Sequence, residues 1–402
     1  MIVWLALLVP IVTTAVLYFF YKRDVVIWEF LIPFAVSIVL IGVAQLILIH
    51  SQTSDVEYWG GIVTKAEYYE DWNEEVPCVH PTYCETCSTD ANGNTTCSSY
   101  QCGWDHLYDV DYHPEYWRIV NTNGESIRIS EGKYRQLVRK FGNQKFVDLH
   151  RDYHTDDGDK YLSKWPETPE TAEITTTKHT YENRVMASRS VFNFPEVEPQ
   201  DIGKYRLYKY PSIQGHYSQP VVLGNGVPVS GKAQRKFQLI NGYMGRSKQL
   251  RVWVLLFKNQ PRDAGHLQEA LWIGANKNEF VITIGVDSQY NVEWSHVFSW
   301  TETERLKIDT RYYVEEQEEL DLVALADWLK PRLRKQWERR EFAEFDYLKV
   351  EPPTWAVVLI FFLTILANVA VSAYVVMNQY SESYRYGSDD YSPWKSKPWE
   401  RW

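Results

Sequence analysis

The sequence predicts an α+β membrane protein in which three transmembrane helices, two N-terminal and one C-terminal, bracket a mixed α/β water-soluble module. Three apolar segments, residues 2–21, 25–49 and 355–377, are each about as long as a helix that crosses ~30 Å of hydrocarbon. The mean hydropathy of −0.38 is nevertheless low, so the residues between the second and third segments must be hydrophilic and fold in water. Helix-like and strand-like patterns alternate there, which predicts a mixed module.

The first two segments predict an antiparallel helical hairpin. Residues 2–21 carry no charge and end in the bulky run 18–21, whereas a cleaved signal peptide has a basic start and a small-residue cleavage site. Lys22, Arg23 and Asp24 leave room only for a minimal turn before the second segment. We therefore expect the two helices to pack side by side.

Three polar side chains fall inside the predicted spans: Glu29 and Gln45 in the second and Asn368 in the third. Polar groups in lipid gain about 1 kcal/mol by pairing, and an ionisable one is a functional candidate by default. Glu29 is close enough to the interface to reach water, which favours an ordinary anchoring role. All three are candidate interhelical contacts.

All five cysteines fall in one short stretch and are Cys78, Cys84, Cys87, Cys97 and Cys102. Between them, Asn92-Gly93 is typical of a two-residue hairpin turn. Folding the chain back there predicts the disulfides Cys87–Cys97 and Cys84–Cys102. The alternative is one zinc ion held by the same four thiolates, because their spacing is close to that of a zinc knuckle. Cys78 is left unpaired on either interpretation, as a free thiol, an intermolecular link or a replacement ligand.

The side of the membrane that the module occupies follows from the same choice. Lys22 and Arg23 in the short first loop favour a module outside the cell, whereas the basic stretch 330–340 before the third span favours the inside. Disulfides form in an oxidising compartment. We therefore predict a multi-pass protein whose module is extracytoplasmic.

A second group of candidate ligands lies between residues 148 and 159, where carboxylates and imidazoles alternate and an acidic turn follows. The candidate metal ligands are His150, Asp152, His154, Asp156, Asp157 and Asp159. An oxygen-rich turn suits calcium, and a histidine and carboxylate set suits a transition metal or acid–base chemistry. The spacing does not match an EF-hand, and a polar strand edge running into a solvated turn explains the same residues.

Local signals place the elements of the module. Asn123-Gly124 predicts a second hairpin, and Ser130 and Gly142 are typical of the first and last caps of a helix between them. Further on, the patterns predict strands at 204–210, 252–257, 279–285, 292–300 and 306–314, a helix at 261–272, and a helix kinked at Pro331 across 315–345. The strand, helix and strand within 252–285 fit a parallel crossover.

These elements, with a Pro- and Thr-rich stretch near 166, predict the division of the chain. We expect a transmembrane helical hairpin at 1–50, a Cys-rich α+β subdomain at 51–165, a mixed α/β subdomain at 166–314, a juxtamembrane helix at 315–352, a transmembrane helix at 353–378, and a polar and aromatic tail at 379–402.

The crossover unit followed by a membrane helix resembles, at the level of pattern, the small periplasmic domains called TPM domains. The resemblance includes no diagnostic motif, so it assigns a role to no residue. The chain also lacks a G-x-S-x-G elbow, an H-E-x-x-H motif, a dinucleotide fingerprint and a phosphate-binding loop of the full G-x-x-x-x-G-K-[ST] pattern. The run 226–232 reads G-x-x-x-x-G-K, but Ala233 follows it in place of the Ser or Thr. These absences lower the expectation of an enzyme without excluding one.

Three classes of function remain. The sequence favours a membrane-anchored extracytoplasmic binding or assembly module that meets a protein or glycan partner. The alternatives are a structural subunit of a membrane complex or homo-oligomer, and a metal-dependent enzyme centred on residues 148–159. The lipid bilayer is a partner in every case. The formal net charge of −10 argues against nucleic acid, and no cofactor is expected unless zinc or calcium occupies one of the candidate sites.

Overall fold

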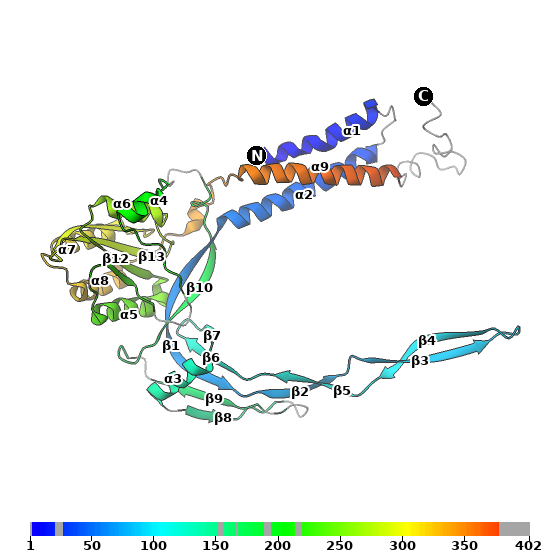
Figure 1. The fold of residues 1–402 in the computed structure, drawn as a ribbon, viewed down its shortest axis with the longest axis horizontal. Helices are drawn as coiled ribbons and strands as arrows, with labels where there is room; N and C mark the ends of the chain where they lie inside the picture. The colour runs from blue at the N-terminus through cyan, green and yellow to red at the C-terminus, as the bar shows by residue number, and fades with distance from the viewer. Residues whose placement is uncertain are drawn as a thin grey trace. The chain divides into compact units, whose positions relative to one another are not determined.

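The computed structural model has a mixed α+β fold with a sheet-rich central region (Figure 1). It describes residues 2–20, 27–142, 144–151, 156, 158–165, 168–188, 194–213 and 219–377. The chain divides into two compact units. The first comprises Met1–Asp55, Thr180–Asn193 and Glu341–Trp402, and the second comprises Val56–His179 and Phe194–Arg340.

The first unit holds the apolar helices. Two of them, α2 (Ile27–Thr53) and α9 (Thr354–Met377), are long and apolar enough to cross a membrane. The first apolar segment forms a 3₁₀ helix, η1 (Ile2–Leu7), and then α1 (Leu8–Phe20), which is shorter than a span. A crossing by this segment therefore stays a prediction. The turn at 22–24 lies outside the described residues, as does the tail from 378 onward.

The apolar helices pack through aliphatic side chains and one polar contact. Ile41 of α2 and Ile360 of α9 are buried in the same cluster. Asn368 donates a hydrogen bond through Nδ2 to Ser37 Oγ at 2.7 Å, and both residues are fully buried. Glu29 is also buried, at 3% exposure. Polar side chains therefore lie in the interior of this unit, and the Asn368–Ser37 hydrogen bond joins α9 to α2.

A six-stranded sheet is built around the long strand β1 (Ser54–Tyr69). Its strand order is β7-β6-β1-β9-β8, with β10 also paired to β1. The bounds are β6 (Tyr116–Asn121), β7 (Ser126–Ile129), β8 (Gln144–Val147), β9 (Lys160–Lys164) and β10 (Ile174–Glu182). Helix α3 (Glu131–Phe141) buries Tyr134 and Leu137 against it.

The local signals around α3 are confirmed. β6 and β7 form the hairpin predicted at Asn123-Gly124, and Gly124 has the positive φ of 83° that such a turn requires. Ser130 accepts a hydrogen bond from the backbone N–H of Lys133 and so begins the helix. Gly142, with φ of 69°, ends it.

A mixed four-stranded sheet lies between residues 222 and 299, in the order β11-β12-β13-β14. β12 (Arg251–Lys258) and β13 (Glu279–Val286) are parallel and joined by α6 (Asp263–Leu271), so the predicted crossover is confirmed. The other elements are α4 (Pro199–Lys204), β11 (Val222–Asn225), α5 (Gly231–Lys248), β14 (Val292–Ser299), α7 (Glu304–Glu315), α8 (Leu322–Gln336) and η2 (Phe342–Phe345). Every residue of β13 is buried.

Two predicted strands are wrong. The segment predicted as a strand at 204–210 is instead the end of α4 followed by irregular chain, and 306–314 is helix α7. The helix predicted across 315–345 is interrupted, because α7 ends at Glu315 and α8 begins only at Leu322. Pro331 lies within α8 as expected.

Candidate metal centre in the hairpin arm

Residues 72–113, all of them described, form two successive two-stranded ribbons that we call the arm (Figure 1). The proximal ribbon pairs β2 (Trp72–Pro77) with β5 (Tyr108–His113), and the distal ribbon pairs β3 (Pro81–Thr89) with β4 (Thr95–Trp104). None of the residues in these four strands is buried. An isolated two-stranded hairpin is marginally stable in water, so the arm needs support other than a hydrophobic core.

The distal ribbon is supported by two cysteine pairs at disulfide distance. The sulfur atoms lie 1.90 Å apart in Cys84–Cys102 and 1.99 Å apart in Cys87–Cys97. These are the pairs that the turn at Asn92-Gly93 predicts, and Gly93 has the positive φ of 90° typical of such a turn. Sulfur atoms in disulfide bonds are not thiolates, so these four cysteines do not form the alternative zinc site.

Between the two ribbons the ladder is interrupted on both strands at the same level. Pro77 pairs with Tyr108 on one side of this break, and Pro81 pairs with Trp104 on the other. The intervening residues are 78–80 and 105–107. Only two backbone hydrogen bonds close the break, from Cys78 N to Leu107 O at 3.2 Å and from Asp105 N to His80 O at 3.0 Å.

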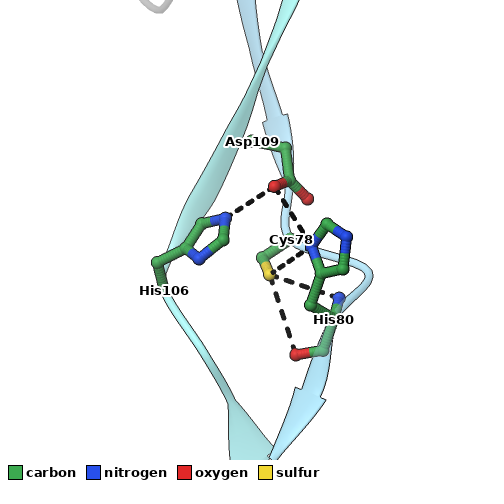
Figure 2. A group of neighbouring side chains, drawn as sticks. All are labelled: Cys78, His80, His106 and Asp109. Atoms are coloured by element: carbon green, nitrogen blue, oxygen red, sulfur yellow. Dashed lines mark hydrogen bonds and ion pairs between the residues drawn. The ribbon is translucent and has the colours of Figure 1, made fainter.

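Four metal-ligating side chains converge on this break, as Figure 2 shows: Cys78, His80, His106 and Asp109. Cys78 Sγ, one ring nitrogen of each histidine and a carboxylate oxygen all lie within 4.8 Å of one another. Cys78 Sγ is 3.7 Å from His80 Nδ1. Asp109 Oδ1 is 3.3 Å from the same His80 nitrogen and 2.5 Å from His106 Nε2.

The burial of these four groups differs. Cys78 is 6% exposed and has no disulfide partner. The side chains of His80 and His106 are 63% and 48% exposed, so both rings lie at the surface. The cluster therefore has a buried thiol at its base and two imidazoles that solvent can reach.

Asp109 links the cluster to the backbone. Its Oδ2 accepts a hydrogen bond from the backbone N–H of Val79 at 3.1 Å, in the opposite strand. The hydrogen bond from His106 holds the pKa of Asp109 below its ordinary value, against the effect of burial, and the Val79 N–H and the charge of His80 act in the same direction. Its carboxylate is thus favoured as an anion, the form that binds a cation.

The base of the arm is held by ring stacking. Trp72 stacks on His113 with centroids 4.0 Å apart, and the Arg151 guanidinium lies 3.8 Å from the centre of the Trp72 ring. Gly158 also packs closely against Trp72, because an added Cβ there would lie 2.5 Å from Trp72 Cβ. The proximal ribbon is therefore attached to the chain that connects β8 and β9, and the distal ribbon is cross-linked within itself.

The arm is strongly acidic. It contains seven carboxylates and no lysine or arginine, and the carboxylates are Glu74, Glu75, Glu85, Asp90, Asp105, Asp109 and Asp111. Large apolar side chains are also exposed along it, namely Val79, Tyr83, Tyr100, Trp104, Leu107, Tyr108, Val110 and Tyr112. Aromatic rings and negative charge are thus presented together on an uncovered surface.

The candidate ligands at 148–159 are not brought together where the structure describes them. His150 makes an ion pair with Asp148 at 3.4 Å. Asp156 accepts a hydrogen bond from Asn73 Nδ2, and Asp159 accepts one from the backbone of Leu149. Asp152, His154 and Asp157 lie outside the described residues.

A second set of possible ligands lies in the four-stranded sheet. His266 and Glu269 are one turn apart on α6, and His296 of β14 faces them, with ligand atoms within 4.8 Å of one another. His296 Nε2 is 2.7 Å from Glu269 Oε2. Burial and the neighbouring His296 lower the pKa of His266. This set offers three donors rather than four.

Sequence reasoning left Cys78 as a leftover thiol and did not select His80, His106 or, as a site residue, Asp109. The available signal was two short motifs, Cys78-x-His80 and His106-x-x-Asp109, placed on the two sides of a predicted hairpin. Each motif alone is weak, and only the pairing of the strands joins them.

The function must be argued from this geometry. No protein-family model matches the chain, no curated protein is significantly similar to it, and no solved structure matches it.

Proposed function

We propose that the chain is a membrane-anchored, extracytoplasmic binding module whose arm docks on a basic protein surface. The observation that carries this proposal is the arm itself, an exposed ribbon that contributes no buried side chain from its strands and is held in shape by two disulfides. Such an element adds little to the stability of the fold. Its maintenance is explained by contact with another molecule.

The compartment follows from the cysteine pairs and the helices. Disulfides persist in oxidising compartments, so the arm belongs outside the cytoplasm. α2 enters β1 directly and α9 closes the described chain, and both are long and apolar enough to cross a bilayer. In this proposal the protein is multi-pass, and the bilayer anchors the module at both ends.

The chemistry of the arm indicates the chemistry of its partner. Exposed rings such as Tyr83 and Trp104 are the kind of side chain that forms the energetic centre of protein interfaces. Seven carboxylates in a ribbon that contains no lysine or arginine repel another acidic surface and attract a basic one. A second copy of this chain, with a net charge of −10, is a poor match. The complementary partner is a protein surface rich in lysine and arginine.

Site-specific photo-crosslinking in native membranes tests the proposal. A photoreactive residue replaces Tyr83 or Trp104 in the arm, and Tyr312 of α7, which is 54% exposed, serves as the matched control position. We expect the arm positions, and not the control, to give one protein adduct that maps to a basic peptide. The adduct should weaken when salt is raised and when Glu85→Lys and Asp105→Lys are introduced.

Other outcomes would overturn the proposal. If the adduct is a dimer of this chain, the arm mediates self-association and not docking on a basic partner. If the adduct is a glycan, the arm binds carbohydrate. Equal labelling at the arm and at Tyr312, or an adduct indifferent to both charge reversals, would show that the arm does not dock on a basic protein surface.

A further inference from the structure

We infer that Cys78, His80, His106 and Asp109 bind one Zn²⁺ ion, which fastens the arm at the break between its two ribbons. Metal binding by these residues stands on their geometry alone. The consequence for docking rests on the proposed function.

The donor set determines the class of metal. One thiolate, two imidazoles and one carboxylate are the three ligand types that zinc accepts in proteins, and four protein donors are typical of a closed structural site. Calcium and magnesium require mostly oxygen ligands and are disfavoured by sulfur and nitrogen. The set therefore suits a tetrahedral divalent transition metal, with zinc the usual occupant.

The distances fit one ion. In a tetrahedral zinc site with bonds of about 2.0–2.3 Å, neighbouring ligand atoms are separated by about 3.3–3.8 Å. Cys78 Sγ to His80 Nδ1 is 3.7 Å, and His80 Nδ1 to Asp109 Oδ1 is 3.3 Å. The hydrogen-bonded pair His106 Nε2 to Asp109 Oδ1 is 2.5 Å apart and would have to lengthen to about 3.3 Å when an ion replaces the shared proton.

An ordinary surface ion pair explains the cluster less well. Both histidine rings approach the same carboxylate oxygen of Asp109, although each is exposed enough to turn elsewhere. Cys78 is the only cysteine of the chain without a disulfide partner, and its sulfur is directed to the same point. A single cation between them would satisfy all four groups at once.

The position of the cluster gives the ion a mechanical role. Two ligands come from residues 78–80 and two from 106–109, so the ion would cross-link the two strands at the level where the ladder is broken. The distal ribbon has its disulfides, and the proximal ribbon is held at its base by the contact of Trp72 with Arg151. Without an ion, the remaining links at the break are the two backbone hydrogen bonds and the contacts of Asp109 with Val79 N and His80. Zinc would therefore fix the direction of the distal ribbon.

Metal content of the full-length protein in detergent tests the site. The protein is stripped with EDTA under non-reducing conditions, re-equilibrated with ZnCl₂ and desalted, and its zinc is measured. We expect one zinc per chain in the arm, and its affinity should fall at least about 100-fold in His106→Ala and Cys78→Ser. In a Co²⁺-loaded sample, a thiolate-to-metal absorption band should be present and should disappear in Cys78→Ser.

The second donor set supplies the matched control. His266→Ala and His296→Ala should leave the Co²⁺–thiolate band unchanged. They should also retain the zinc ion of the arm, which is the ion that His106→Ala loses. The intact Cys84–Cys102 and Cys87–Cys97 bonds, checked by non-reducing mass mapping, show that each arm variant has folded. A wild-type protein without the thiolate band, or with zinc that depends on His266 rather than His106, would overturn the site.

Hydrogen exchange separates the metal from its consequence for docking. Zinc should slow exchange in peptides covering residues 78–80 and 105–109 of the wild type by at least about tenfold, and not in His106→Ala. Unchanged exchange with zinc bound would refute the fastening role. If zinc binds and slows exchange but Tyr83 gives no basic-protein adduct, the metal site stands and the proposed docking function fails.

Discussion

Glu67 lies in the middle of the six-stranded sheet, and its replacement tests how the sheet that carries the arm is held together. Its side chain is fully buried on β1 and lies 2.7 Å from Lys65 Nζ, 2.5 Å from Arg118 Nε and 3.0 Å from Lys160 Nζ. Burial raises the pKa of Glu67, but hydrogen bonds from these three cations outweigh that effect and lower its pKa to about 2. The native state therefore favours the ionised form of the Glu67 carboxyl group.

The magnitude follows from the pKa. A carboxylate whose pKa is lowered on folding stabilises the native state above its unfolded pKa, and this stability is lost as the pH falls through the native pKa. The difference between the ordinary 4.5 and about 2 corresponds to about 3 kcal/mol at pH 7. Between pH 7 and pH 3, about 2 kcal/mol of it is lost, because the unfolded carboxyl group becomes protonated while the native one does not.

Glu67→Gln removes the titrating group and leaves the three cations without their anion. We expect the free energy of opening of β1, measured by hydrogen exchange on the full-length protein in detergent, to fall by about 3 kcal/mol at pH 7. The gap between wild type and variant should narrow by about 2 kcal/mol at pH 3. Glu131→Gln, which removes an exposed pair with Arg135 on α3, is the control and should cost less than about 0.5 kcal/mol. A gap of the same size at both pH values would refute the reasoning.

Three further predictions concern other parts of the chain. Gly245→Ala should lower the free energy of unfolding by about 3 kcal/mol or more and so lower the thermal unfolding midpoint, because the added Cβ would lie 1.7 Å from the backbone oxygen of Gly60. An unchanged midpoint would contradict this close approach of α5 to β1. The double variant Cys87→Ser/Cys97→Ser removes a link that closes a loop with a sequence separation of 10, so the distal ribbon should lose about 3 kcal/mol and become sensitive to protease, which limited proteolysis followed by mass spectrometry measures. Asn368→Leu should cost about 1 kcal/mol in the detergent-solubilised helical unit through loss of its bond to α2, and an unchanged resistance to denaturing detergent would show that the bond adds no stability.

Features that depend on a few neighbouring residues could be predicted from the sequence. The turns at Asn92-Gly93 and Asn123-Gly124, and the helix between Ser130 and Gly142, require backbone conformations and caps that their own residues supply. The buried strand β12 is likewise marked by an unbroken apolar run at 252–257. In each case the determining interaction spans no more than about a dozen residues.

The wrong strands show where local patterns are ambiguous. Residues 306–314 are rich in β-branched and aromatic side chains, which favour a strand, but the buried residues Leu306, Thr310 and Val314 recur every four positions, as they do on one face of a helix. Residues 204–210 alternate in polarity for another reason. Tyr208 turns inward, where its hydroxyl donates to the backbone oxygen of Leu256 at 2.6 Å, so tertiary contact and not strand pairing orders this segment.

The candidate metal centre depends on a long-range feature that no local signal marks. The two motifs that build it lie 26 residues apart along the chain, and they meet because the two strands keep one register on both sides of the break, with Pro77 opposite Tyr108 and Pro81 opposite Trp104. Farther out, the distal ribbon carries a bulge, with Thr82 opposite Gly103 and Tyr83 opposite Gln101. Cys102 is the extra residue. The bulge residue Cys102 forms the bond with Cys84, and the pairing from Thr82 with Gly103 to Trp72 with His113 sets residues 78–80 against 105–107. The covalent support of the arm and its candidate cation site therefore both depend on strand pairing, which neither short motif marks by itself.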